Sequence, residues 1–229
     1  DYFTLETVES LEKIATSISI ALLRRQAEEE LAATTEKLRE SLIGTLQAMS
    51  LTVETKDPYT AGHQKRVSRL ARTIAQEMGL AGDVIDSIRM AGAIHDIGKL
   101  AVPAEILSKP TKLSDIEMGI IKTHPQTGYS ILKETTLPPV IAEIIVQHHE
   151  RMNGSGYPSG LKGEQILLEA QILAVADVVE AMAFYRPYRP GLGIDIALDE
   201  IEKNRGLLYN VEVAGACLRL FREKGFDFE

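Results

Sequence analysis

Five histidines and two buried-looking aspartates carry the strongest chemical signal in this sequence of 229 residues. His95 and Asp96 lie in the apolar segment AGAIHDIGKL, and Asp177 lies in the apolar segment QILAVADVVEAMAF. A carboxylate in apolar surroundings is costly unless it is paired or bound to a metal. The candidate metal ligands are His63, His95, Asp96, His124, His148, His149 and Asp177.

These seven side chains offer imidazole nitrogens and carboxylate oxygens but no thiolate. Such a set suits iron, manganese, zinc or nickel, and a lone Cys217 excludes a cysteine-based zinc site. Seven ligands are too many for one ordinary metal ion, so they predict two ions with Asp96 as the bridging ligand. Two metals about 3.5–4 Å apart hold a hydroxide between them and stabilise in-line displacement at phosphorus. Lys99 is expected on nearly the same helical face as Asp96, where it would neutralise phosphate charge.

Each of these features also has a purely structural interpretation. A lone histidine is more often a packed core residue than a ligand, and an aspartate in a helix is often a cap or an ion-pair partner. Cys217 is expected to be a small residue packed inside a C-terminal helix. The combination favours a metal centre because every histidine of the chain fits the same scheme.

Composition limits the class of protein. The formal charge of −8 argues against a non-specific nucleic-acid binder, which needs a basic face. No run of 18 apolar residues and no signal-peptide pattern is present, so we expect a cytoplasmic protein without a membrane segment. The length allows one domain with an extension. Because the sequence begins at Asp1 rather than Met, we expect a longer protein with an upstream sensory domain.

The N-terminal part predicts a long amphipathic helix. Between residues 5 and 53 there is no proline and only one glycine, and the apolar stripe occupies Val8, Leu11, Ala15, Ile18 and Leu22. After the charged segment RRQAEEE, the stripe resumes at Leu31, Leu38, Leu42, Leu46, Met49 and Val53. This spacing is close to that of a two-helix seam, which predicts a homodimer through this helix. The alternative is two shorter helices folded on the domain.

The rest of the chain predicts an all-α domain. Helical blocks separated by glycine and proline are expected at roughly 60–78, 81–97, 114–134, 139–150, 169–184, 193–203 and 210–224. We find no convincing alternating strand. The expected organisation is an N-terminal linker helix over residues 1–50 and a compact helical bundle around a metal centre over residues 51–229.

The motifs together resemble the HD-GYP domains, a branch of the HD metal-dependent phosphohydrolases. The resemblance runs from DPYTAGHQKRVSRLA through HDIGKLAVPAEILSKP, IKTHPQTGYSIL, IIVQHHERMNGSGYPSGLKGEQI and ILAVADVVEAM to RPYRPGLG. It implies a phosphodiesterase that hydrolyses cyclic di-GMP to linear pGpG, GMP or both, with two divalent ions, iron or manganese. The segment FTLETVESLEKIATSISIALLRRQAEEEL resembles the last helix of a GAF-type sensory domain. Diguanylate cyclase (GGDEF) proteins are further expected partners.

The resemblance also implies roles for individual residues. It assigns the seven candidate ligands to the metals, with Asp96 bridging, and Lys99 to the phosphate. Asp57 matches an acid that orients this lysine or protonates the leaving 3′ oxygen. The expected substrate contacts are Gly156, Tyr157, Pro158, Arg186 and Arg189. Glu180 is expected to orient a ligand by hydrogen bonding, and Arg66 and Arg69 are expected in solvent or in supporting contacts.

Two positions depart from the family pattern. Some members have a glutamate four residues before the first histidine that helps to hold a third metal, but this chain has Tyr59. Many members have lysine after RPYR, but this chain has Pro190, which puts ligand affinity or base selectivity in doubt. Two other functions therefore stay open: a binding module that signals through the N-terminal helix with little turnover, and a phosphohydrolase of another cyclic dinucleotide.

Overall fold

The computed structural model describes residues 4–56, 62–184 and 191–228. By its internal contacts the chain divides into two units, residues 1–45 and residues 46–229. The described residues form helices with only isolated β-bridges, Asn153 with Lys162 and Arg205 with Tyr209. The predicted all-α class is therefore confirmed. No helix in the described ranges is long and apolar enough to cross a membrane.

The predicted N-terminal helix is a single continuous element, α1 (Leu5–Lys56), so the alternative of two shorter helices is wrong. Within residues 1–45 the stripe residues Leu11, Ile18 and Leu22 stay more than half exposed. The last turns of α1 behave differently, because Leu46 and Val53 are buried in the core of the second unit. The sequence predicted one apolar stripe for pairing with a second helix. The last part of that stripe instead packs in the core of the second unit.

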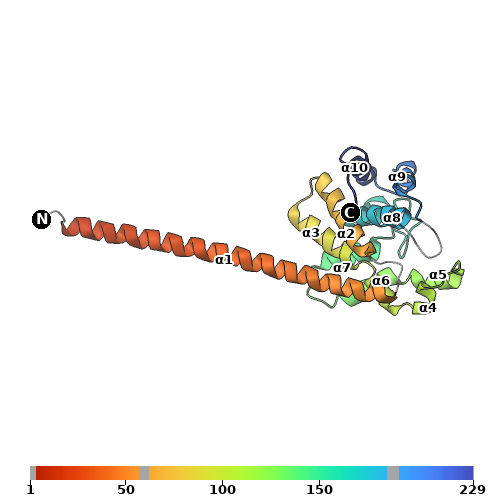
Figure 1. Cartoon of the computed structure of the whole chain (residues 1–229), viewed down its shortest axis with the longest axis horizontal. Helices are drawn as coiled ribbons and strands as arrows, with labels where there is room; N and C mark the ends of the chain where they lie inside the picture. Colours follow the sequence, from red (N-terminus) through yellow and green to blue (C-terminus); the bar gives the residue numbers. More distant parts are fainter. Residues whose placement is uncertain (1–3, 57–61, 185–190, 229) are drawn as a thin grey trace. The chain divides into compact units, whose positions relative to one another are not determined.

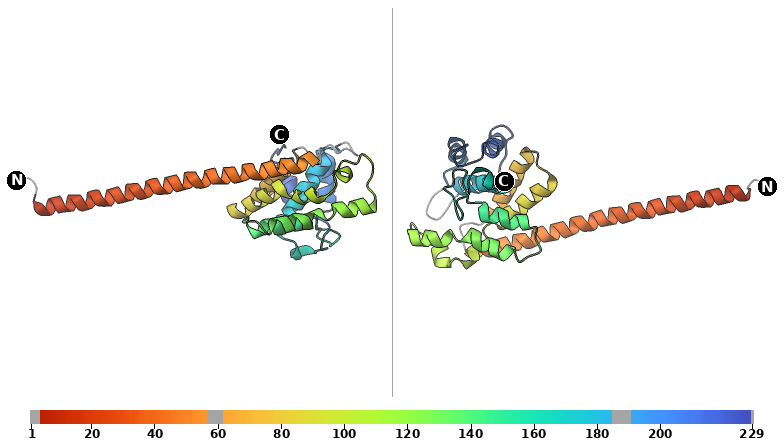
Figure 2. Two further views of the ribbon diagram at one scale, coloured as in Figure 1. Left: turned by 90° about the horizontal axis from the view of Figure 1, so that it is seen from below. Right: turned by 180° about the vertical axis from the view of Figure 1, so that it is seen from behind.

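The second unit is a bundle of short helices (Figures 1 and 2). Its elements are α2 (His63–Glu77), α3 (Gly82–Ile94), η1 (Ile97–Ala101), α4 (Ala104–Leu107), α5 (Asp115–Ile121), α6 (His124–Leu132), α7 (Pro139–Gln147), η2 (Gly163–Gln165), α8 (Leu168–Ala183), α9 (Ile194–Lys203) and α10 (Val211–Arg222). Helix α2 packs on α3 and α8, and α6 packs on α7 and η1. Helices α9 and α10 lie at the opposite end of this unit from α4 and α5 (Figure 2).

The apolar core of the bundle is built by residues of several helices. Leu70 and Ile74 of α2, Ile144 of α7 and Ile172 of α8 are completely buried. Cys217 is buried in α10, as predicted, and burial raises the pKa of its thiol to about 12. The core therefore packs together the helices whose ends carry the candidate ligands.

One predicted helix is wrong. The block at 114–134 is two helices, because α5 ends at Ile121 and α6 begins at His124. Pro125 lies in the first turn of α6, where its missing N–H costs nothing, but it would break the middle of a longer helix. The break allows His124 to occupy a helix start.

Candidate metal centre

The structure brings all seven candidate ligands together. They come from the start of α2, the two residues after α3, the start of α6, the two residues after α7 and the middle of α8. Six of the seven are buried, and the His149 side chain retains 18% of its exposure. Three groups of these side chains place one donor atom from each member within 4.8 Å of the others. The groups are His63, His95 and Asp177; His124, His148 and His149; and His95, Asp96 and His148.

Three of the histidines are oriented by the ends of the helices that precede them. The Nδ1–H groups of His95, His124 and His148 donate to the carbonyls of Gly92 (3.0 Å), Ile121 (2.8 Å) and Ile145 (2.6 Å), each three residues earlier. The last carbonyls of a helix have no partner inside the helix, so these bonds satisfy them. Because Nδ1 carries the proton, Nε2 is the free nitrogen that faces the centre. A hydrogen bond on the other ring nitrogen is typical of histidine metal ligands.

Asp96 faces two of the groups at once. Its Oδ1 lies 3.4 Å from Nε2 of His124. Its Oδ2 lies 3.9 Å from Nε2 of His63 and 3.8 Å from Nε2 of His95. The two oxygens of one carboxylate thus point to different sets of imidazoles, as a bridging ligand requires.

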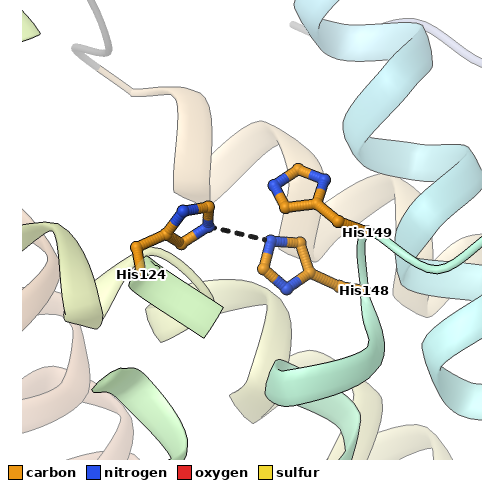
Figure 3. Close-up of side chains that lie close together, drawn as sticks. All are labelled: His124, His148 and His149. Atoms are coloured by element: carbon orange, nitrogen blue, oxygen red, sulfur yellow. Dashed lines mark hydrogen bonds between the residues drawn. The ribbon is translucent and has the colours of Figure 1, made fainter. Parts of the chain in front are cut away.

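The donor set fits a metal cation. Nε2 of His124 and Nε2 of His148 lie 3.4 Å apart, and both nitrogens present lone pairs because both Nδ1 atoms are donors (Figure 3). Two lone pairs at this distance repel each other unless a cation lies between them. Two imidazole nitrogens bound at ~2.0–2.1 Å to one tetrahedral ion are separated by a similar distance, ~3.4 Å. The arrangement is therefore suited to a metal and is unfavourable without one.

Burial controls the protonation of these imidazoles. It lowers the pKa of His124 to about 4 and the pKa of His148 to about 3, so both rings are neutral at pH 7. Burial also opposes the charged form of His63. Hydrogen bonds and the charges of Asp177 and Glu180 outweigh that effect and raise the pKa of His63 to about 9.

His63 is held from behind by Glu180. The Nδ1 atom of His63 contacts the Glu180 carboxylate, and its Nε2 lies 3.3 Å from Oδ1 of Asp177. Asp177 and Glu180 are three residues apart on α8 and so share one face. Arg66 pairs with Glu180 at 2.6 Å and lies over the ring of Phe184. These contacts agree with the expectation that Glu180 orients a ligand and that Arg66 has a supporting position.

Lys99 lies beside Asp96, as the sequence spacing predicted. Its Nζ is 2.6 Å from Oδ2 of Asp96. Burial opposes the charged form of Asp96, but the positive charge of Lys99, the largest favourable contribution, holds the pKa of Asp96 well below its usual range. The lysine therefore brings a positive charge to the edge of the ligand cluster.

A glycine fixes the distance between two parts of the centre. A Cβ atom on Gly98 would lie 1.9 Å from the carbonyl oxygen of His124 and 2.7 Å from the amide nitrogen of Gly128. Only glycine permits this approach of η1 to α6. It sets Asp96 and Lys99 next to His124.

The predicted substrate contacts divide into two sets. Tyr157, which precedes Pro158 in the chain, lies next to the centre with its ring 4.7 Å from the ring of His149, and Gly156 lies against the backbone of residues 149–151. The other two predicted contacts, Arg186 and Arg189, lie outside the described residues, as do the catalytic candidate Asp57 and the departures Tyr59 and Pro190. Arg69, for which solvent was one expectation, contacts the ring of Phe226.

Sequence reasoning did not identify Glu150. Its side chain is 2% exposed, and its carboxylate accepts hydrogen bonds from the amides of Ser159 (2.8 Å), Gly160 (3.2 Å) and Leu161 (3.0 Å). The available signal was a glutamate directly after two candidate ligands, at the end of an apolar helix.

The sequence is similar to known proteins. The sequence pattern of HD domains matches residues 47–213. Over 194 residues the chain is 39% identical to the cyclic di-GMP phosphodiesterase response regulator RpfG of Xanthomonas campestris pv. campestris, covering 84% of this chain and 51% of that protein. Over 156 residues it is 36% identical to the 3'3'-cGAMP-specific phosphodiesterase 1 of Vibrio cholerae, covering 68% of this chain and 36% of that protein. The chain thus spans about half or less of these relatives.

A solved structure supports the fold. The HD domain of the phosphodiesterase PgpH from L. monocytogenes, in complex with cyclic-di-AMP, superposes with a TM-score of 0.54. The alignment covers 79% of this chain and 98% of that domain at 20% identity. The likeness supports the helical architecture.

Proposed function

The chain belongs to the HD domain family, and from this premise we propose that it is a metal-dependent phosphodiesterase that hydrolyses cyclic di-GMP to linear pGpG, GMP or both. The observation that carries the proposal is the convergence of the seven candidate ligands, with Lys99 at their edge. Bound at these ligands, two divalent ions, iron or manganese, would generate the hydroxide nucleophile and stabilise charge at phosphorus. Residues 51–229 form the catalytic domain in this proposal.

In this scheme the side chains of the protein hold the metals and orient the substrate. The five histidines and Asp177 would hold the metals, and Asp96 would be their shared ligand. Lys99 donates to a phosphate oxygen as negative charge develops there, which is the kind of contact that lowers a barrier most. The side chains of Tyr157 and Pro158 shape the rim where the dinucleotide enters, with Gly156 between them and the end of α7. Asp57, Arg186 and Arg189 keep their predicted roles as proton donor or orienting acid and as phosphate or guanine contacts.

A second candidate substrate is 3'3'-cGAMP or another cyclic dinucleotide. A relative of comparable identity is named for 3'3'-cGAMP, and the metal ligands alone do not distinguish these substrates. Each has two phosphodiester bonds in one ring, so the same centre would serve. The difference must come from contacts to the bases.

One experiment tests the proposal and its alternatives. The protein is purified without oxygen, its metals are measured, and products are separated after incubation with cyclic di-GMP, 3'3'-cGAMP or cyclic-di-AMP. We expect cleavage of cyclic di-GMP by the wild type and none by the His95→Ala, Asp96→Ala double variant. A metal-loaded wild type that binds cyclic di-GMP without cleaving it would refute the enzyme and support a binding module. Faster cleavage of 3'3'-cGAMP would reassign the substrate.

We also propose a homodimer through α1. In residues 1–45, Leu11, Ile18 and Leu22 are 51–56% exposed at seven-residue and four-residue steps, and a second copy of the helix would cover them. Light scattering during gel filtration would measure the mass. An Ile18→Glu, Leu22→Glu variant should run as a monomer, and a wild type that is monomeric at high concentration would exclude this dimer.

A further inference from the structure

The buried carboxylate of Glu150 has no role in the chemistry proposed above. We propose that Glu150 is a positioning residue: it fastens the loop of residues 153–162, called here the Gly-Tyr-Pro loop, so that Tyr157 stacks on His149 and fixes the orientation of that imidazole. This inference rests on the proposed metal centre. In this inference the loop orients one of the candidate metal ligands.

The first observation is how Glu150 holds the loop. Both of its oxygens are used, Oε1 by the amides of Ser159 and Gly160 and Oε2 by the amide of Leu161. Three successive amides around one ionised carboxylate form a strong, charge-assisted contact. The carboxylate is almost fully buried, so this contact is shielded from water. A glutamate used only for surface charge would not be bound in this way.

The second observation is the contact between the loop and the end of α7. The amide of Tyr157 donates to the carbonyl of His149 at 3.3 Å. A Cβ atom on Gly156 would lie 2.4 Å from Cα of Glu150, 2.5 Å from the carbonyl oxygen of His149 and 2.6 Å from the amide nitrogen of Arg151. The loop is therefore packed on the backbone of residues 149–151, and only glycine permits it. Gly156 allows the loop to lie close to the end of α7, and the hydrogen bonds of Glu150 hold it there.

The third observation is the position of His149. No hydrogen bond of its ring nitrogens is found among the described residues, unlike those of His95, His124 and His148. Its Nδ1 lies 3.9 Å from Oδ2 of Asp177. The ring of Tyr157 covers it at 4.7 Å with an angle of 31° between the planes. Stacking therefore supplies the orientation that a hydrogen bond supplies to the other three.

Substitutions separate this role from a general structural one. In Glu150→Gln the amide NH2 group faces backbone donors and only one acceptor oxygen is left, so at least one loop amide loses its partner. Tyr157→Leu removes the stacked ring, whereas Tyr157→Phe keeps it. Glu164→Gln is the matched control, because Glu164 is an exposed glutamate soon after the loop that makes no side-chain hydrogen bond among the described residues.

The metal-independent readout is the proton NMR spectrum of His149 in metal-free protein. The stacked Tyr157 ring should shift the His149 ring protons upfield. We expect that shift to be lost in Glu150→Gln and Tyr157→Leu and kept in Tyr157→Phe and Glu164→Gln. A shift retained in Glu150→Gln would overturn the inference, whether or not the protein binds metal, and a shift retained in Tyr157→Leu would show that the ring does not stack on His149.

The second readout is metal affinity, followed by Co²⁺ titration. Loss of a side chain that orients a metal ligand weakens metal binding by ~10–100-fold. We expect a loss of this size in Glu150→Gln for the more weakly bound of the two ions. In a His149→Ala background the same substitution should have no further effect, because the two changes act through one imidazole. An equal effect in both backgrounds would refute positioning through His149. A wild type that binds no metal would instead refute the proposed function and leave the NMR measurement to decide.

Discussion

The close approach at Gly98 leads to a sharp prediction for Gly98→Ala. The added Cβ atom would lie 1.9 Å from the backbone oxygen of His124, while real Cβ atoms stay beyond 3.0 Å, so η1 and α6 must separate by about 1.1 Å. Overpacking costs ~1–3 kcal/mol, and the value should be near ~3 kcal/mol because the neighbours are backbone atoms that cannot rotate away. For a unit of this size the melting temperature should fall by ~6–12 °C.

The matched control is Gly119→Ala. Gly119 lies inside α5, and an added Cβ atom would meet nothing within 4 Å. Replacing an exposed helical glycine by alanine should stabilise the fold by ~0.5–1 kcal/mol. The two variants should therefore differ by ~4 kcal/mol in unfolding free energy.

Thermal and urea unfolding followed by circular dichroism, in chelator, would measure this difference without any metal contribution. A metal titration of the folded variant would then show weaker binding in Gly98→Ala, because Asp96 and Lys99 move relative to His124. If the two variants differ by less than ~1 kcal/mol, within the range of ordinary surface changes, the close packing does not limit the fold and the reasoning is refuted.

Three further outcomes follow from the same contacts. The pKa of His63 is raised to about 9, so a metal that binds this imidazole must displace its proton, and metal affinity should increase as the pH rises from 7 toward about 9. Calorimetry in buffers of different ionisation enthalpy would detect the released proton, and a binding enthalpy that does not depend on the buffer would contradict this prediction. Lys99→Met should lower kcat by ~10²–10³-fold with unchanged metal content, whereas Lys112→Met, at an exposed position, should not; equal rates would remove Lys99 from the reaction. Cys217 should resist a thiol reagent until the protein unfolds, because burial raises its pKa to about 12; rapid labelling of the native protein would contradict the buried position.

Local patterns predicted most of the helices because their apolar faces repeat at the helical period. The break before His124 was missed because apolar residues continue on both sides of it, and Pro125 is compatible with a helix start. The sequence pattern also could not predict that Leu42 and Leu46 differ in burial. Both lie on one apolar stripe of α1, but Leu46 is 3% exposed in the second unit and Leu42 is 39% exposed. Which part of a stripe a domain covers depends on tertiary packing.

The ligands of the candidate centre could be selected from the sequence because buried histidines and aspartates are rare in apolar segments. Their partners were harder to identify. Glu180 could be suggested because it is one turn from Asp177, whereas Glu150 binds amides nine to eleven residues later in a loop without periodicity. A hydrogen bond to a loop amide leaves no trace in side-chain spacing.

The five imidazoles are oriented by contacts of two kinds, local and long-range in sequence. His95, His124 and His148 are aimed by carbonyls only three residues behind them, so their alignment needs no more than the end of one helix. His63 depends on Glu180, 117 residues away, and His149 depends on the loop that carries Tyr157. The alignment of three imidazoles therefore depends only on the helix that precedes each of them. The alignment of the other two depends on contacts between distant parts of the bundle, so a change far from the centre in sequence can disturb His63 or His149 and leave the other three in place.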